Sequence, residues 1–87
     1  MTSFNELYRL IESRKITPVE NSRTNQLFEL GVHEIGKKLV EEASETWMAA
    51  EYESKDALAL EASQLIYNLQ VLLVAKGVTL PEIEEKL

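Results

Sequence analysis

Apolar residues recur every three or four positions across the second half of the chain, which is the spacing of amphipathic helices. From about Val32, one side of such a helix carries a row of apolar residues: Ile35, Leu39, Ala43, Trp47 and Ala50. The pattern lapses over residues 52–55, where Ser54 can cap a new helix through its hydroxyl. It then resumes on nearly every side from about Asp56 to Lys76. The pattern therefore predicts two long helices joined by a short turn.

A turn this short makes the two helices antiparallel neighbours. Counting outward from a turn near residues 53 and 54 predicts which positions lie at the same height. Three pairs should lie level with one another: Glu45 with Glu61, Glu42 with Gln64, and Lys38 with Asn68. The sequence thus predicts a polar seam between the two helices.

Shorter helices flank this hairpin. Ser3 and Glu6 form a capping-box pattern that starts a helix ending near Arg14. A polar connection over residues 15–25 leads to a short helix over 24–30, and a second capping box at Thr79 and Glu82 starts a last helix through residue 87. Residues 1–87 are therefore predicted to form one all-α domain, a helical bundle of two long antiparallel helices with short flanking helices.

The second long helix is too apolar to be covered by the rest of a small monomer. A helix that is apolar on every side must be buried on every side, and 87 residues supply only a few other helices. We therefore expect a homodimer, in which a second copy of the chain completes the bundle.

The polar seam predicts a metal site. Two carboxylates about 4 Å apart repel by roughly 4 kcal/mol at the effective dielectric of a protein surface, so Glu42, Glu45 and Glu61 require a cation if they converge. Oxygen ligands without cysteine or a nearby histidine favour Mg2+ or Mn2+ over zinc. The alternative is that the glutamates form a solvated helix face, with Lys38 as an ordinary ion-pair partner.

Charge and composition restrict the possible partners. The net charge is −6, which argues against nucleic acid and against anionic membranes. The chain has no cysteine, starts with no signal-peptide pattern, and breaks its most apolar run at Asn68 and Gln70. A soluble cytoplasmic protein is expected.

Polar residues near position 23 are candidates for holding phosphate or ribose oxygens. Ser22, Arg23 and Thr24 lie at the start of the short helix, although Ser22 can also simply cap it. Lys38 shares the stripe of Glu42 and is the better phosphate contact, whereas Lys37 points about 100° away.

Two motifs resemble those of the phosphoribosyl-ATP pyrophosphohydrolase family of histidine biosynthesis. They are the segment 36–45, which reads GKKLVEEASE, and the segment 61–68, which reads EASQLIYN. The segment 71–80 is similar to the C-terminal signature of the family, and Ser22 and Thr24 match its upstream Ser-x-Thr. Two departures are Gln64, where the wider motif has Asp, and Arg23, where an aromatic residue is expected.

The resemblance implies Mg2+-dependent hydrolysis of phosphoribosyl-ATP to phosphoribosyl-AMP and pyrophosphate. It implies metal ligation by Glu42, Glu45 and Glu61, and it makes Gln64 a weak ligand, an outer partner or no ligand at all. Either Glu41 or Glu45 would orient the attacking water. The implied substrate contacts include Lys37 and Lys38, and further candidates are Ser22, Arg23, Thr24 and Asn68.

Two other functions remain open at this point. The first is a pyrophosphatase of the same superfamily that removes dUTP or aberrant NTPs, because its metal seam would be the same. The second is a non-catalytic helical interaction module whose glutamates are only solvated surface.

Overall fold

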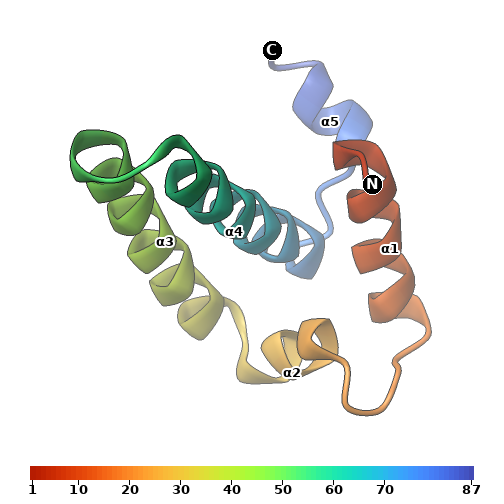
Figure 1. Ribbon diagram of the computed structural model, residues 1–87. Helices are drawn as coiled ribbons and strands as arrows, with labels where there is room; N and C mark the ends of the chain where they lie inside the picture. The colour runs from red at the N-terminus through yellow and green to blue at the C-terminus, as the bar shows by residue number, and fades with distance from the viewer.

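The chain is helical throughout, as the hydrophobic pattern predicts. The computed structural model describes residues 1–87 and contains five helices and no strand. In chain order these are α1 (Phe4–Ile16), α2 (Arg23–Leu30), α3 (Val32–Tyr52), α4 (Lys55–Ala75) and α5 (Leu80–Glu84). Figure 1 shows α3 and α4 as a long hairpin beside α1, with α2 bridging between them at one end. The all-α prediction is confirmed.

Local capping accounts for the helix starts. The side chains of Ser3, Ser22 and Ser54 each accept a hydrogen bond from a backbone N–H in the first turn of their helices. Thr79 and Glu82 form the complete capping box that the sequence predicts. The helix ends differ more from the prediction. α1 continues past Arg14 to Ile16, where Pro18 then disfavours further helix, and α5 stops at Glu84 rather than at residue 87.

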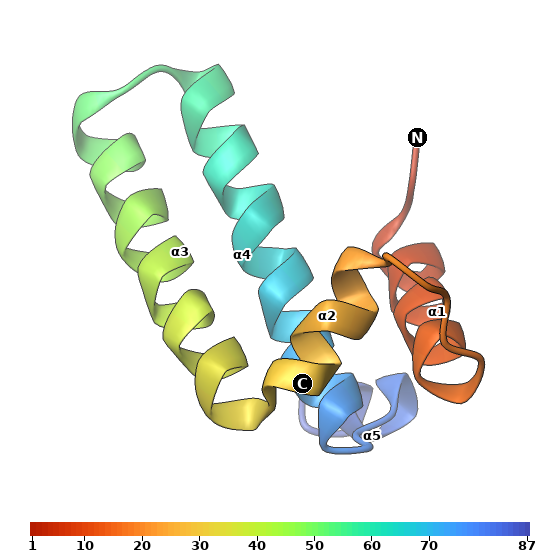
Figure 2. The same cartoon turned by 90° about the horizontal axis from the view of Figure 1, so that it is seen from below.

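α4 is the central helix of the fold. It packs along α3 and also contacts α1 and α2. The buried apolar core lies at the open end of the hairpin, and its members come from four helices: Tyr8, Ile11, Leu27, Ile35, Val71 and Val74. In Figures 1 and 2 the closed end of the hairpin extends away from α1, α2 and α5. The core therefore anchors one end of the hairpin and leaves the other end projecting.

Polar side chains fasten α4 to its surroundings. Gln70 is fully buried and donates from Nε2 to the carbonyl oxygen of Phe4, at 3.2 Å. Lys15 donates from Nζ to the carbonyl oxygens of Val74 (3.0 Å) and Ala75 (3.3 Å) at the C-terminal end of α4. By length and composition alone, α4 is apolar enough to cross a membrane, with a mean hydropathy of 1.4. Only 22% of that span is buried within the chain.

The prediction of which residues form the apolar side of α3 is confirmed for the first two residues of the row and wrong for the others. Ile35 is buried and Leu39 is half-buried, but Trp47 is 67% exposed, and both Ala43 and Ala50 are exposed. Ala49 is buried in their place. The stripe that faces α4 is a mixed one, which contains Ile35, Leu39, Glu42, Thr46 and Ala49 at helical spacing. The predicted apolar row is instead an outer face of α3.

Candidate functional site

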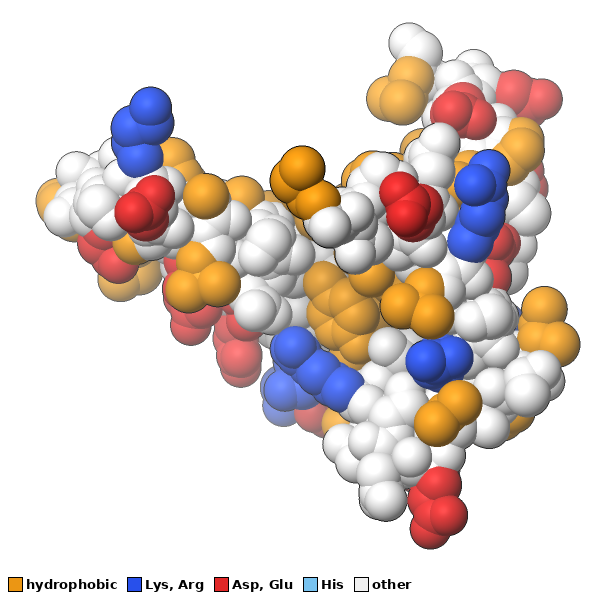
Figure 3. Space-filling view, turned by 45° about the vertical axis from the view of Figure 1, so that its right-hand side comes forward, with side chains coloured by type: hydrophobic (Ala, Val, Ile, Leu, Met, Phe, Trp, Pro, Cys, Tyr) orange, Lys and Arg blue, Asp and Glu red, His pale blue; other side chains and the backbone are white.

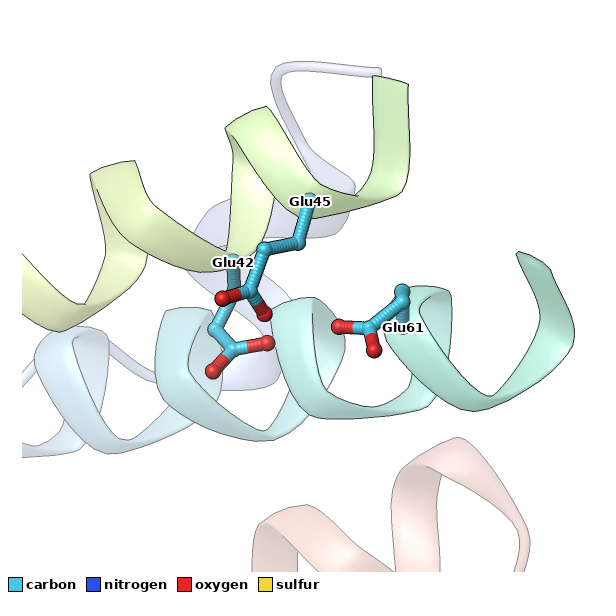
Figure 4. A group of neighbouring side chains, drawn as sticks. All are labelled: Glu42, Glu45 and Glu61. Carbon is cyan, nitrogen blue, oxygen red and sulfur yellow. The ribbon is translucent and has the colours of Figure 1, made fainter. Parts of the chain in front are cut away.

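Three glutamates converge between the two long helices. Glu42 and Glu45 extend from α3, and Glu61 extends from α4 toward them (Figure 4). One carboxylate oxygen from each lies within 4.8 Å of the others. Glu45 and Glu61 therefore meet across the hairpin as predicted, and the three carboxylates do not point away from one another into solvent.

No lysine or arginine forms an ion pair with any of the three glutamates. The one ion pair of the protein joins Lys37 to Glu34, at 3.8 Å, outside the cluster. Glu42 is half-buried, and its Oε2 atom is buried without a hydrogen-bond partner. A buried anionic oxygen without a donor is costly unless it binds a proton or a cation.

The electrostatics of the cluster favour proton uptake by two of the three glutamates. Burial raises the pKa of Glu42 above its usual value, and the neighbouring charge of Glu45 adds to this increase. Hydrogen bonding with Glu45 raises the pKa of Glu61, with burial and the charges of Glu45 and Glu42 as further causes. The same repulsion that retains protons here would retain a divalent cation.

Gln64, a predicted metal ligand, lies one turn from Glu61 but makes a different contact. Its Oε1 atom accepts a hydrogen bond from Arg23 Nη2 at 3.3 Å. Its backbone carbonyl accepts from Asn68 Nδ2 at 2.8 Å. Asn68 is 1% exposed, and its Oδ1 atom has no hydrogen-bond partner. Gln64 and Asn68 thus follow Glu61 at successive turns of α4, and the side-chain oxygen of Gln64 is engaged by Arg23.

A second polar group lies where α2 begins. The guanidinium carbon of Arg23 lies 4.9 Å from the centre of the Tyr67 ring. The hydroxyl groups of Tyr67 and Thr24 share a hydrogen bond of 2.6 Å. Ser22 caps the helix by accepting from the N–H of Asn25. The sequence reasoning missed Tyr67, since its position in an apolar run gave no signal beyond the expected core.

The remaining predicted residues, Lys37, Lys38 and Glu41, also lie on α3. Lys37 and Glu41 line a shallow surface on one side of α3, together with His33 and Val40. Lys38 is exposed and has no ion-pair partner. Of the two residues predicted to orient water, only Glu45 belongs to the converging carboxylates, whereas Glu41 does not.

The sequence model of the phosphoribosyl-ATP pyrophosphohydrolase family matches residues 4–87. The chain belongs to this family. It is 50% identical over 82 residues to the phosphoribosyl-ATP pyrophosphatase of Streptomyces coelicolor, covering 93% of this chain and 91% of that protein. It is 46% identical to the phosphoribosyl-ATP pyrophosphatase of Bifidobacterium adolescentis over 87 residues, which is the full length of both chains.

Another relative joins this family to a second activity in one chain. The histidine biosynthesis bifunctional protein HisIE of Caldanaerobacter subterraneus is 52% identical over 83 residues, covering 95% of this chain and 40% of that protein. The matched part of the bifunctional protein is thus a region the size of this domain. Membership in a pyrophosphohydrolase family favours an enzyme over the non-catalytic helical module.

Proposed function

We propose that this protein hydrolyses phosphoribosyl-ATP to phosphoribosyl-AMP and pyrophosphate, as a step of histidine biosynthesis. The observation that carries the proposal is the convergence of Glu42, Glu45 and Glu61 on one point between α3 and α4, in a member of the phosphoribosyl-ATP pyrophosphohydrolase family. Family membership indicates the substrate, and the carboxylates form a site that could bind a polyphosphate together with its cation.

We propose Mg2+ as the cofactor, with Mn2+ as a substitute. The residues fit such an ion, because three carboxylates offer only oxygen ligands and neither cysteine nor histidine lies in the group. One oxygen from each of the three carboxylates lies within 4.8 Å of the others, so small side-chain movements would let Glu42, Glu45 and Glu61 share one ion. The unpartnered Oε2 atom of Glu42 would gain the cation that it lacks.

The residues of the chain then bind and orient the reactants. A bound Mg2+ would neutralise phosphate oxygens and acidify a water molecule. Glu45 is the better candidate to orient that water, because it is exposed and belongs to the group of three, whereas Glu41 lines another part of α3. The water would attack the α-phosphorus in line with the departing pyrophosphate.

The candidate substrate contacts differ in how the structure supports them. Lys38 is an exposed cation on the same helix as Glu42 and is free to reach a phosphate. Lys37 is the weaker candidate, since it pairs with Glu34. Ser22, Arg23 and Thr24 remain candidates at the start of α2, and Asn68 has a buried acceptor without a partner.

The decisive assay is pyrophosphate release from phosphoribosyl-ATP, with and without Mg2+. We expect release that requires the ion and that is lost in Glu61→Gln, while the helical content of the variant is unchanged. Glu29→Gln, which removes the same charge from the exposed surface of α2, is the matched control. Equal turnover of dUTP or common NTPs would refute the substrate assignment, and turnover by Glu61→Gln near that of the original protein would refute the site.

We also propose a homodimer. Large apolar side chains reach the surface along both hairpin helices, among them Val40, Trp47, Leu60 and Ile66, and Figure 3 shows hydrophobic side chains on the surface of the projecting arm. Covering them with a second copy would contribute roughly 25 cal/mol for each Å² of apolar surface buried. Trp47→Glu should convert a dimer into a helical monomer in analytical ultracentrifugation, and a monomeric original protein would contradict the proposal.

We propose a cytoplasmic location without membrane or nucleic-acid partners. The net charge of −6 disfavours phosphate backbones and anionic lipid surfaces. α4 buries Asn68 and Gln70 among the other helices, and these side chains would be costly in lipid. Cell fractionation of the full chain tests this proposal, and we expect the protein in the soluble fraction.

A further inference from the structure

The contacts of Arg23 point to a role that the carboxylates do not fill. Arg23 is the first residue of α2 and therefore places a positive charge at the positive end of a helix dipole. This arrangement is unfavourable by roughly 0.3–1 kcal/mol in an exposed helix. An anion at this place would be attracted by both the guanidinium and the first amide groups of the helix.

The guanidinium is held in place, yet it keeps most of its donors. Nη2 of Arg23 donates to Gln64 Oε1. Gln64 follows Glu61 by three residues on α4, so the two side chains lie on neighbouring turns. No carboxylate lies within ion-pair distance of Arg23, although its charge acts on Glu42 and lowers the pKa of that carboxyl against the larger effect of burial. An arginine has five N–H donors in a rigid fork that matches phosphate oxygens, and only one of these donates to a protein acceptor here.

Tyr67 is the support of this arm. Its ring lies under the guanidinium at 4.9 Å, within the range of a cation–π interaction. Its hydroxyl is fixed by Thr24 at 2.6 Å, and the ring packs against the buried core. Tyr67 therefore ties the start of α2 to the middle of α4, at the turn of α4 that follows Gln64.

We propose that Tyr67 positions Arg23 as a phosphate-binding arm of the carboxylate site. Resting on the proposed function, this inference assigns the two ends of a bound pyrophosphate group to different parts of the chain. The carboxylates of Glu42, Glu45 and Glu61 would hold the cation that neutralises one phosphate, and Arg23 binds oxygens of the phosphate nearer α2. Tyr67 is a positioning residue that acts through Arg23, and Gln64 serves as a contact for Arg23 rather than as a metal ligand.

Binding of inorganic pyrophosphate, measured by titration calorimetry at saturating Mg2+, tests the arm without requiring turnover. Arg23→Gln should weaken pyrophosphate binding roughly tenfold to a hundredfold, as expected for loss of charged hydrogen bonds. Mg2+ affinity in the absence of pyrophosphate should stay the same or increase, since a nearby positive charge is removed. Arg23→Lys should fall between the two, because it keeps the charge and loses the fork.

A double-mutant cycle tests the positioning role. Tyr67→Leu should weaken pyrophosphate binding several-fold when Arg23 is present and cause no further loss in the Arg23→Gln background. Tyr67→Phe keeps the ring under the guanidinium and should have the smaller effect. Equal losses from Tyr67→Leu in both backgrounds, or a pyrophosphate affinity of Arg23→Gln within twofold of the original, would overturn the proposal. If pyrophosphate binds through Arg23 but phosphoribosyl-ATP is not hydrolysed, the substrate assignment fails and the arm stands.

Discussion

Glu42→Gln should make the protein more stable without divalent cations and less stable with them. The change keeps the shape of the side chain and removes one of three converging negative charges. Glu42 is the member of the group with a buried, unpartnered oxygen, and burial and Glu45 raise its pKa. In EDTA at neutral pH, the folded state must therefore hold a charge that it disfavours.

The size of the effect follows from the separation of the carboxylates. Unit charges 4.8 Å apart, the limiting distance between ligand oxygens in this group, repel by roughly 3.5 kcal/mol at an effective dielectric of 20 and roughly 0.9 kcal/mol in water. Because Glu45 is exposed, the lower value applies and about 1 kcal/mol is expected. For a domain of this size, that corresponds to an increase in Tm of about 4–8 °C.

Addition of Mg2+ should reverse the order of stability. A ligand at a hundred times its Kd stabilises the folded state by about 2.7 kcal/mol, which exceeds the gain from removing the charge. Thermal unfolding followed by circular dichroism, in EDTA and across a Mg2+ titration at fixed protein concentration, measures both effects. Glu20→Gln is the control, since it removes the same charge from the connection before α2. A Mg2+-induced increase in Tm that is as large in Glu42→Gln as in the original protein would refute the metal site, and a lower Tm of the variant in EDTA would refute the repulsion argument.

Three further predictions concern pH and packing. Folding favours the protonated forms of Glu42 and Glu61, because both carboxyl groups have raised pKa values in the folded state. The stability gained from this proton binding is complete below about pH 4.5 and is lost as the pH rises through the raised pKa values. In EDTA, the stability advantage of Glu42→Gln should therefore grow from pH 4.5 to 7 in urea unfolding, and a constant difference would contradict this. Tyr8→Phe removes a fully buried hydroxyl that donates to the Val78 carbonyl, and it should cost about 1–3 kcal/mol in the same assay. Lys15→Met removes two hydrogen bonds to the end of α4 and should cost about 1 kcal/mol, with no change in Mg2+ affinity.

The register of the site was predictable because it depends on counting. Ser54 marks the start of α4, and the helical rise then sets which residues of α3 and α4 lie level. Glu45 and Glu61 meet for this reason, and no knowledge of tertiary packing is needed. The helix caps at Ser3, Ser22 and Thr79 are equally local, which explains why the sequence predicts them.

The facing of α3 was not predictable in the same way. Two stripes on this helix contain apolar residues, one through Ala49 and one through Trp47 and Ala50. Periodicity says that each stripe exists but not which one α4 covers. The covered stripe includes Glu42, so the more apolar of the two remains outside. Tyr67 escaped prediction for a related reason, since its partners Arg23 and Thr24 are more than forty residues away and only the tertiary fold brings them together.

The three carboxylates interrupt the apolar packing between the two helices of the hairpin. The apolar core holds Ile35 of α3 and Val71 of α4 at the open end, and Ala49 is buried toward the closed end. Between these contacts the helices present Glu42, Glu45 and Glu61 to one another, where apolar side chains would have contributed favourable burial. Functional sites are commonly placed in such regions of low local stability. A cation between the helices would replace this repulsion by attraction. A second copy of the chain on the exposed apolar face would cover and hold the projecting arm. Ligand binding and assembly would therefore each compensate for the apolar burial that the hairpin lacks.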